Sequence, residues 1–277
     1  MKAKPLYVML RILLLSVFSL TILYPLLWML GVSLKDQKDM FARPWSIVPQ
    51  EFLWTNFSKA WTVGKIGQSM GNTAFVTVVT LLFIVVFCYL ASYALARIEF
   101  RGRKLILTLF ISTMLLPIQI ILIPLYRIQK SLHLIDSLWG LILPYIAIGL
   151  PISIFLMTAF LRSVPFELEE SASIDGANRL QLIYKIMLPL SRPGLATVVI
   201  LQFMTIWNEF PLALIVINNP ELRTITLALS NFKGLWGMMD FNKLFAALVI
   251  TTLPVIAMFI IFQRQFISGL TSGALKG

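Results

Sequence analysis

Long apolar stretches separated by short polar segments dominate this chain. Six of them reach the length of about 20 residues that a helix needs to cross the hydrocarbon core of a bilayer. They cover residues 12–34, 70–95, 105–126, 138–161, 194–217 and 244–262. The pattern predicts an all-α membrane protein, a single domain over residues 1–277 with six transmembrane helices and both termini on one side of the membrane.

The polar segment between the fourth and fifth stretches, residues 162–193, carries the clearest local signals. Pro165 suits the first turn of a helix, where its missing N–H group costs nothing, so a short helix is expected to start near it. Three glutamates follow, close to the positive end of the helix dipole. Asp175-Gly176 then predicts a sharp turn, because glycine adopts positive φ without steric cost.

A second helix is expected after this turn. Asn178 can cap its N-terminus, and Leu180, Ile183 and Met187 would share one face at helical spacing. Leu188-Pro189 should end it, because proline lacks the N–H group that continues the hydrogen-bond ladder. The segment is therefore predicted to be helix, turn, helix.

Composition agrees with a membrane protein. The chain is 58% hydrophobic with a mean hydropathy of +0.87, and 13% of its residues are charged, against about 25% in soluble domains. Its net charge of +11 comes from basic residues scattered between apolar runs, which disfavours a nucleic-acid-binding stripe. The predicted side that holds the N-terminus has 13 Lys and Arg residues, and the other side has 10. This difference favours a cytoplasmic location for the N-terminus, for segment 162–193 and for the tail 263–277.

Several chemistries lack the residues they need. Cys88 and His133 are each the single residue of their type, which excludes an internal disulfide, a thiolate or multi-histidine metal site and a Ser-His-Asp constellation. Gly64-Lys65 lacks the upstream glycine and the following hydroxyl of a P-loop. The stretch 12–34 is longer than the apolar part of a signal peptide and is expected to remain as the first span.

The fifth stretch contains Trp207-Asn208-Glu209. A carboxylate inside an apolar segment should face a cavity or a partner, and an aromatic ring beside hydrogen-bonding groups suits a sugar. The alternative is that Trp207 packs between helices and Glu209 pairs with a neighbouring subunit. Gln119 and Gln202 are further candidates for the substrate pathway, although interhelical hydrogen bonding is the commoner role of such amides.

Prolines occur within the later apolar stretches. A proline within lipid leaves carbonyl groups that need partners from neighbouring helices or water, so these prolines predict kinked helices packed around a cavity. Incidental kinks in a generic bundle are the alternative. The prolines concerned are Pro117, Pro124, Pro144, Pro151, Pro211 and Pro254.

Segment 162–193 resembles the coupling loop, or EAA loop, of ABC importer permeases, with a serine at the second small position. The residues that match, or that the resemblance places at the contact with an ATPase, are Glu170, Ser171, Ala172, Asp175, Gly176, Ile186, Leu188 and Pro189. The C-terminal tail resembles that of the smaller permease in maltose-type carbohydrate importers, where it reaches between the ATPase subunits. Its candidate interface residues are Gly269, Gly273, Lys276 and Gly277.

The resemblance covers essentially the whole chain and implies a type I importer permease in a bacterial or archaeal cytoplasmic membrane. The chain would form half of a sugar pore with a second, homologous permease, two ATPase subunits and an extracytoplasmic binding protein, in contact with lipid and with no nucleic acid. It would not be an enzyme, since ATP and Mg would bind to the partner ATPases. Glu170 would hold a basic residue of the ATPase, and residues 218–240 would face the binding protein.

Two alternatives are kept at this point. The coupling loop alone also fits an importer for another solute, such as glycerol phosphate or a peptide. A secondary carrier is less favoured, because it needs coupling-ion residues near the middle of the membrane and only Glu209 is available there.

Overall fold

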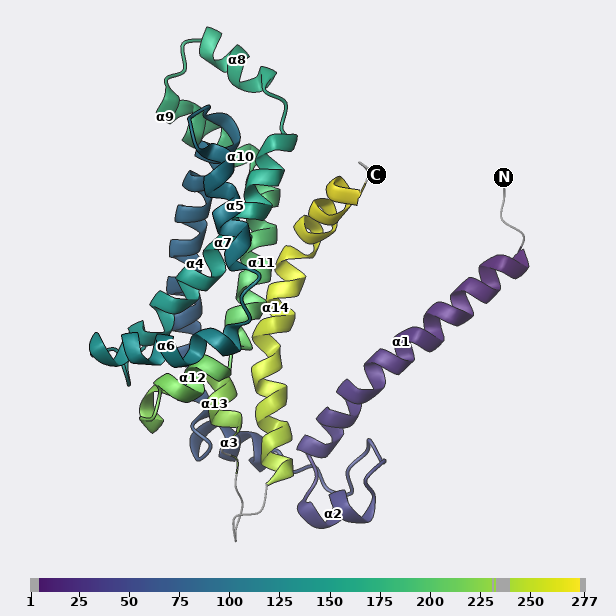
Figure 1. The fold of residues 1–277 in the computed structure, drawn as a ribbon. Helices are drawn as coiled ribbons and strands as arrows, with labels where there is room; N and C mark the ends of the chain where they lie inside the picture. Colours follow the sequence, from purple (N-terminus) through teal and green to yellow (C-terminus); the bar gives the residue numbers. More distant parts are fainter. Residues whose placement is uncertain (1–4, 231, 233–239, 275–277) are drawn as a thin grey trace. The chain divides into compact units, whose positions relative to one another are not determined.

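The computed structural model describes residues 5–230, 232 and 240–274, and every regular element in them is helical (Figure 1). The chain divides into two compact units. Unit 1 comprises residues 1–68 and 228–253, and unit 2 comprises residues 69–227 and 254–277. Two helices, α4 (Ile66–Arg97) and α14 (Phe241–Ala274), contribute to both units.

Unit 2 contains most of the helices. Beside the larger parts of α4 and α14, its long elements are α5 (Arg103–Thr113), α6 (Ile118–Ser131), α7 (Trp139–Ser163) and α11 (Arg192–Trp207). Its short elements are α8 (Glu167–Ile174), α9 (Arg179–Gln181), the π-helix η1 (Leu182–Met187), α10 (Leu188–Leu190), α12 (Pro211–Val216), the 3-10 helix η2 (Pro220–Leu222) and the start of α13 (Ile225–Leu229).

The centre of unit 2 is α7, which packs against α5 and α11. Residues on all sides of α7 are buried, and Leu141, Ile142, Met157 and Leu161 are fully inaccessible. Burial around the whole circumference is the property of a helix enclosed by other helices. Cys88 of α4 is buried in the same core, as expected of a small apolar side chain.

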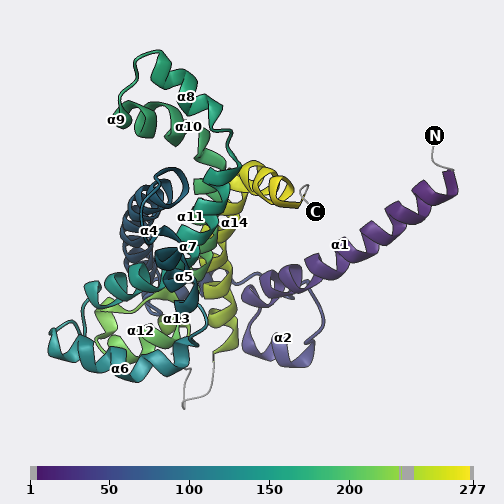
Figure 2. The same cartoon turned by 45° about the horizontal axis from the view of Figure 1, so that its top comes forward.

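The segment α8–α10 projects beyond one end of α4, α7 and α11, whereas α6 and α12 lie beside each other at the opposite end (Figure 1, Figure 2). The exposed helical hairpin and the neighbouring helices α6 and α12 thus lie at opposite ends of unit 2 (Figure 1, Figure 2).

Four described helices are long and apolar enough to cross a membrane, and two bent helix pairs raise the number to six if each pair is one span. The stretch 105–126, expected as one helix, is interrupted: α5 and α6 meet at 96°, and Pro117, with a ψ of 133°, stands at the break. The stretch 194–217 is also interrupted, because α11 ends at Trp207 and α12 begins at Pro211. In both cases a proline begins a new helix where it cannot continue the old one.

Unit 1 contains α1 (Pro5–Ser33), α2 (Gln37–Ala42), α3 (Thr55–Thr62) and the first part of α14. No part of the most apolar window of α1 is buried by the described residues, so its apolar side chains require lipid or another protein. The small core of this unit joins the end of α3 to the start of α14 through Ala60, Ile66, Phe232 and Ala246.

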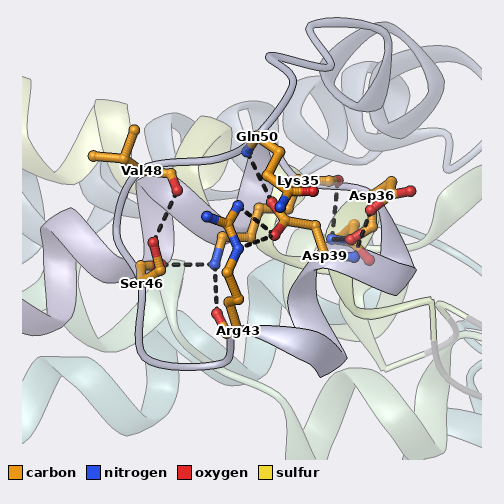
Figure 3. Close-up of polar contacts among 8 residues, drawn as sticks. Lys35, Asp36, Asp39, Arg43, Ser46, Val48 and Gln50 are labelled. Atoms are coloured by element: carbon orange, nitrogen blue, oxygen red, sulfur yellow. Dashed lines mark hydrogen bonds and ion pairs between the residues drawn. The ribbon is translucent and has the colours of Figure 1, made fainter.

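The loop after α1 is held by buried polar groups (Figure 3). Lys35 is fully buried, and its Nζ donates to the carbonyl oxygens of Arg43 at 2.8 Å and Ser46 at 2.7 Å. Asp39 accepts from Arg43 Nε and Nη2 and from the Gln50 N–H group. Burial raises the pKa of Asp39, but the hydrogen bonds from Gln50 and Arg43 and the nearby positive charges outweigh it, so the pKa lies below its usual value.

Candidate functional site

The first arm of the predicted coupling loop is α8. It begins at Glu167, two residues after Pro165, and ends before Gly176, whose φ is +87°. A Cβ atom at Gly176 would meet no atom within 4 Å, so the backbone conformation, and not crowding, requires glycine here. The predicted helix and turn are therefore present, with the start of the helix shifted by two residues.

The second arm starts at Asn178 as expected. The Asn178 side chain accepts from the Gln181 N–H group, and the Gln181 side chain accepts from the Asn178 N–H group, each at 2.9 Å, which makes a capping box. The helix then widens into the π-helix η1.

This widening corrects the predicted face of the second arm. Leu180 is 67% exposed, whereas Met187 is fully buried together with Leu182. In a π-helix the hydrogen bonds join residues five apart, so Leu182 and Met187 share a face, and the regular helical period behind the prediction does not apply.

Pro189 does not end the second arm, because the helix continues to Leu190. Pro189 stands in the first turn of α10, where no N–H group is needed. The direction of the chain changes after Leu190, where the second arm and α11 meet at 68°. Ile186 and Leu188, just before this bend, are half-buried.

The outer side of the loop is exposed and partly apolar. Ile174 is 86% exposed and Tyr184 is 52% exposed, while Glu170 and Asp175 are exposed beside them. The described residues give the Glu170 carboxylate no partner. Exposed apolar side chains rimmed by charge are typical of a protein contact surface.

The loop is fixed to the bundle by a residue that the motif does not include. Glu169, not Glu170, is the buried acid of α8. Its Oε1 lies 2.8 Å from Arg97 Nε and its Oε2 accepts from Tyr93 Oη at 3.0 Å. The contact with Arg97 is an ion pair without the alignment of a hydrogen bond. Neither Glu169 nor Arg97 is among the site residues predicted from the sequence; the signal available was the four-residue spacing of Tyr89, Tyr93 and Arg97.

A second candidate site is a cavity of about 260 Å³ within unit 2. It includes two predicted substrate-pathway residues, Gln202 and Glu209. The other lining residues are Ile118, Tyr145, Ile148, Gly149, Ile152, Leu201, Thr205 and Ile206. Its wall is mostly apolar with a few convergent polar groups, the usual chemistry of a small-molecule site.

Glu209 is already satisfied within the chain. Its Oε2 accepts from Tyr145 Oη at 2.5 Å, its Oε1 accepts from the Leu212 N–H group at 2.6 Å, and its Oε2 accepts from the Ala213 N–H group at 3.2 Å. The carboxylate thus caps the start of α12, where free N–H groups would otherwise be exposed to an apolar surrounding.

Gln202 bridges α11 and α7, since its Nε2 donates to Gly149 O and to Ser153 Oγ at 3.0 Å each. This is the interhelical role expected of an amide in a membrane protein.

The other predicted pathway residues do not line this cavity. Trp207 is 6% exposed and stacks on Phe203 with the ring centroids 5.1 Å apart. Asn208 is exposed at the end of α11 and donates to Met204 O, and Gln119 is exposed on α6. The structure therefore unites two of the five candidates.

The predicted tail begins inside a helix, because α14 continues to Ala274. Gly269 and Gly273 lie in this helix, and Lys276 and Gly277 lie outside the described residues.

The fold and the helical hairpin define a class, the helical membrane transport subunits. More particularly, residues 88–272 match the family of binding-protein-dependent transport system inner membrane components, and the chain belongs to this family of ABC importer permeases.

Three comparisons show the extent of the likeness. The chain is 38% identical to the probable ABC transporter permease protein YurM of Bacillus subtilis (strain 168), over 95% of this chain and 87% of that one. It is 34% identical to the sulfoquinovosyl glycerol transport system permease protein SmoH of Agrobacterium fabrum, over 97% and 94%. A chain in the crystal structure of a bacterial ABC transporter that imports the acidic polysaccharide alginate has the same fold, with a TM-score of 0.81, 22% identity and coverage of 95% and 98%.

Proposed function

We propose that this chain is a permease subunit of an ATP-driven importer for a sugar or oligosaccharide, and that it forms half of the translocation pore with a second permease. Relatives at 31–34% identity are named for the transport of trehalose, diacetylchitobiose and sulfoquinovosyl glycerol. The observation that carries the proposal is the projecting hairpin α8–α10, a rigid exposed surface on a chain whose sequence contains no P-loop.

In this proposal the hairpin faces the cytoplasm and docks on an ATPase subunit. Glu170 and Asp175 offer charge, and Ile174, Leu180 and Tyr184 offer exposed apolar surface, a combination that suits a protein interface. Two ATPase subunits bind ATP and Mg, and their closure moves the hairpin as a lever. The pore then changes from inward-facing to outward-facing, and hydrolysis resets it.

The sugar is proposed to pass the cavity that Gln202 and Glu209 line. The cavity volume of about 260 Å³ is slightly below the range of about 300–1,000 Å³ usual for ligand pockets, which suits a partial wall that a second permease completes. Because Glu209 is occupied by Tyr145 and by the N-terminus of α12, its main effect on the sugar is to hold that wall in shape. Trp207, Asn208 and Gln119 remain proposed contacts elsewhere on the pathway.

The proposal is tested by ATP-dependent uptake in proteoliposomes that contain this chain, its partner permease, the ATPase and the binding protein. The probes are trehalose, diacetylchitobiose, raffinose and an arabinooligosaccharide, the sugar classes named for the relatives. We expect uptake of one of them only when ATP and the binding protein are both present. Uptake driven by an ion gradient without ATPase subunits would instead establish a secondary carrier.

A variant at the cavity distinguishes the effect of the cavity on sugar uptake from the effect of the hairpin on ATPase binding. Glu209→Ala removes the cap of α12 and the partner of Tyr145, so we expect altered sugar affinity or lower complex yield with normal copurification of the ATPase. Thr205→Ser is the matched control on the cavity wall, because it keeps the hydroxyl that donates to Leu201 O. Unchanged uptake kinetics and yield in Glu209→Ala would remove Glu209 from the site.

A further inference from the structure

Three polar side chains form a stripe along the last turns of α4. Tyr89, Tyr93 and Arg97 follow one another at intervals of four residues, which places them on one face of the helix. They stand at the end of a strongly apolar helix, and all three contact the coupling hairpin.

The stripe contacts both arms of the hairpin. Tyr89 Oη donates to the carbonyl oxygen of Ile183 at 2.6 Å, inside the π-helix of the second arm. Tyr93 Oη and Arg97 Nε both contact Glu169 of the first arm, at 3.0 Å and 2.8 Å. Arg97 Nη2 also donates to the carbonyl oxygen of Val164 at 2.7 Å, in the linker between α7 and α8.

The first arm packs against η1 of the second arm, and Arg97 lies over the ring of Phe166 at its start. Glu169 is the single buried residue of α8, and the side chains of Glu167, Leu168 and Glu170 on either side of it are exposed. The side chains of Arg97 and Glu169 are each 7% exposed. Loss of one partner would therefore leave a buried charge without compensation, which ties the position of α8 strictly to that of α4.

The contact with the second arm falls inside its π-helix. A π-helix is a local widening that often marks a functional site, and Tyr89 supplies the donor for one of its carbonyl oxygens. The stripe thus holds the first arm by an ion pair and a hydrogen bond and the second arm by a single hydrogen bond.

We infer that Tyr89, Tyr93 and Arg97 are positioning residues that transmit the movement of the coupling hairpin to α4, with Glu169 as their anchor on α8. The inference deepens the proposed function and rests on it, because it needs an ATPase to move the hairpin. Glu170 contacts the ATPase, and Glu169, its neighbour, carries the displacement into the bundle.

The test measures sugar imported per ATP hydrolysed in the reconstituted importer, with the sugar that the uptake panel identifies. Glu169→Gln removes the charge, and Tyr93→Phe and Tyr89→Phe each remove one hydroxyl. Glu167→Gln, on the exposed face of the same helix, and Tyr126→Phe, exposed on α6, are the matched controls. Copurification of the ATPase is measured for every variant, so that a failure to assemble is not mistaken for uncoupling.

We expect Glu169→Gln to lower the ratio roughly tenfold, within the range of about 5- to 150-fold for coupling between sites, with basal ATP hydrolysis and ATPase copurification unchanged. Tyr93→Phe should lower it less, and the double variant should fall short of the product of the two, because both act on one carboxylate. If Glu169→Gln fails to assemble, Tyr93→Phe and Tyr89→Phe decide the question alone.

Two negative results are distinct. A wild-type complex that imports no probe sugar with ATP overturns the proposed function and this inference with it. A wild-type complex that imports normally, with Tyr93→Phe, Tyr89→Phe and any assembled Glu169→Gln matching their controls, overturns the inference alone.

Discussion

The replacement Lys35→Met tests how the outer loop of unit 1 is held. Lys35 is fully buried, and its ammonium group bonds to two carbonyl oxygens of the loop that follows α2 (Figure 3). Methionine keeps an unbranched apolar stem and removes the charge and all donors. The change therefore isolates the two hydrogen bonds with little loss of packing.

The magnitude follows from these bonds. A hydrogen bond to a charged group contributes roughly 1.5–3 kcal/mol, which sets an upper limit of about 3–6 kcal/mol for two. The actual loss should be smaller than this limit for two reasons. Water can hydrogen-bond to the carbonyl groups that the variant leaves free, since Arg43 and Ser46 are only half-buried, and the wild-type ammonium has lost hydration worth several kcal/mol. We expect the free energy of unfolding to fall by about 2 kcal/mol, which corresponds to about 4–8 °C in Tm for a chain of this size class.

The assay is thermal unfolding of the full chain in detergent, followed by tryptophan fluorescence, together with limited proteolysis of residues 36–52. Lys38→Met is the matched control, because Lys38 is exposed in the same segment. Equal Tm values and equal cleavage rates in the two variants would refute the idea that the ammonium holds the loop.

Three further predictions concern single positions. Gly140→Ala should destabilise unit 2 by about 2 kcal/mol or more, because the new methyl would overlap the Leu134 carbonyl oxygen, whereas Gly71→Ala, with nothing within 4 Å, should raise the Tm slightly. The lowered pKa of Asp39 means that its stabilisation is complete above about pH 4 and is lost as the pH falls through the folded-state pKa; acid titration of fluorescence should show this loss in wild type and not in Asp39→Asn. Gly176→Asp should leave the importer assembled but hydrolysing ATP without uptake, because the new side chain obstructs docking; the positive φ adds some strain, which aspartate tolerates better than most residues, and normal uptake would exclude the lever assignment.

Much of the local structure could be predicted from the sequence. The apolar runs mark α1, α4, α7 and α14, because length and hydropathy are properties of the segment alone. The turn at Gly176 and the cap at Asn178 follow from rules that involve residues three or four positions apart. These predictions were confirmed because each depends only on the residues of one short segment.

The failures involve contacts between distant segments. Glu169 and Glu170 are equivalent by local rules, and the contacts of Glu169 with Arg97 and with Tyr93, the latter 76 positions away, distinguish them. The π-helix η1 likewise has a contact with a distant residue, because Ile183 accepts from Tyr89, 94 positions away. The bend of 96° at Pro117 was indicated locally by the proline. Hydropathy did not indicate it, because the apolar stretch continues on both sides of Pro117.

Polar side chains inside unit 2 mostly serve its own backbone. Glu209 caps the N–H groups at the start of α12, Tyr89 supplies a donor to a carbonyl in the π-helix, and Gln202 supplies one to Gly149 O. In an apolar surrounding, backbone N–H and C=O groups must find hydrogen-bond partners within the protein. A polar residue in an apolar stretch is therefore more often a partner for irregular backbone than a contact for substrate. Several exposed carboxylates have no partner among the described residues, and three of them, Glu167, Glu170 and Asp175, lie on the exposed hairpin, where a second protein can reach them. These polar side chains in the apolar stretches therefore shape the chain itself, whereas the exposed carboxylates of the hairpin are open to contact with another protein (Figure 1).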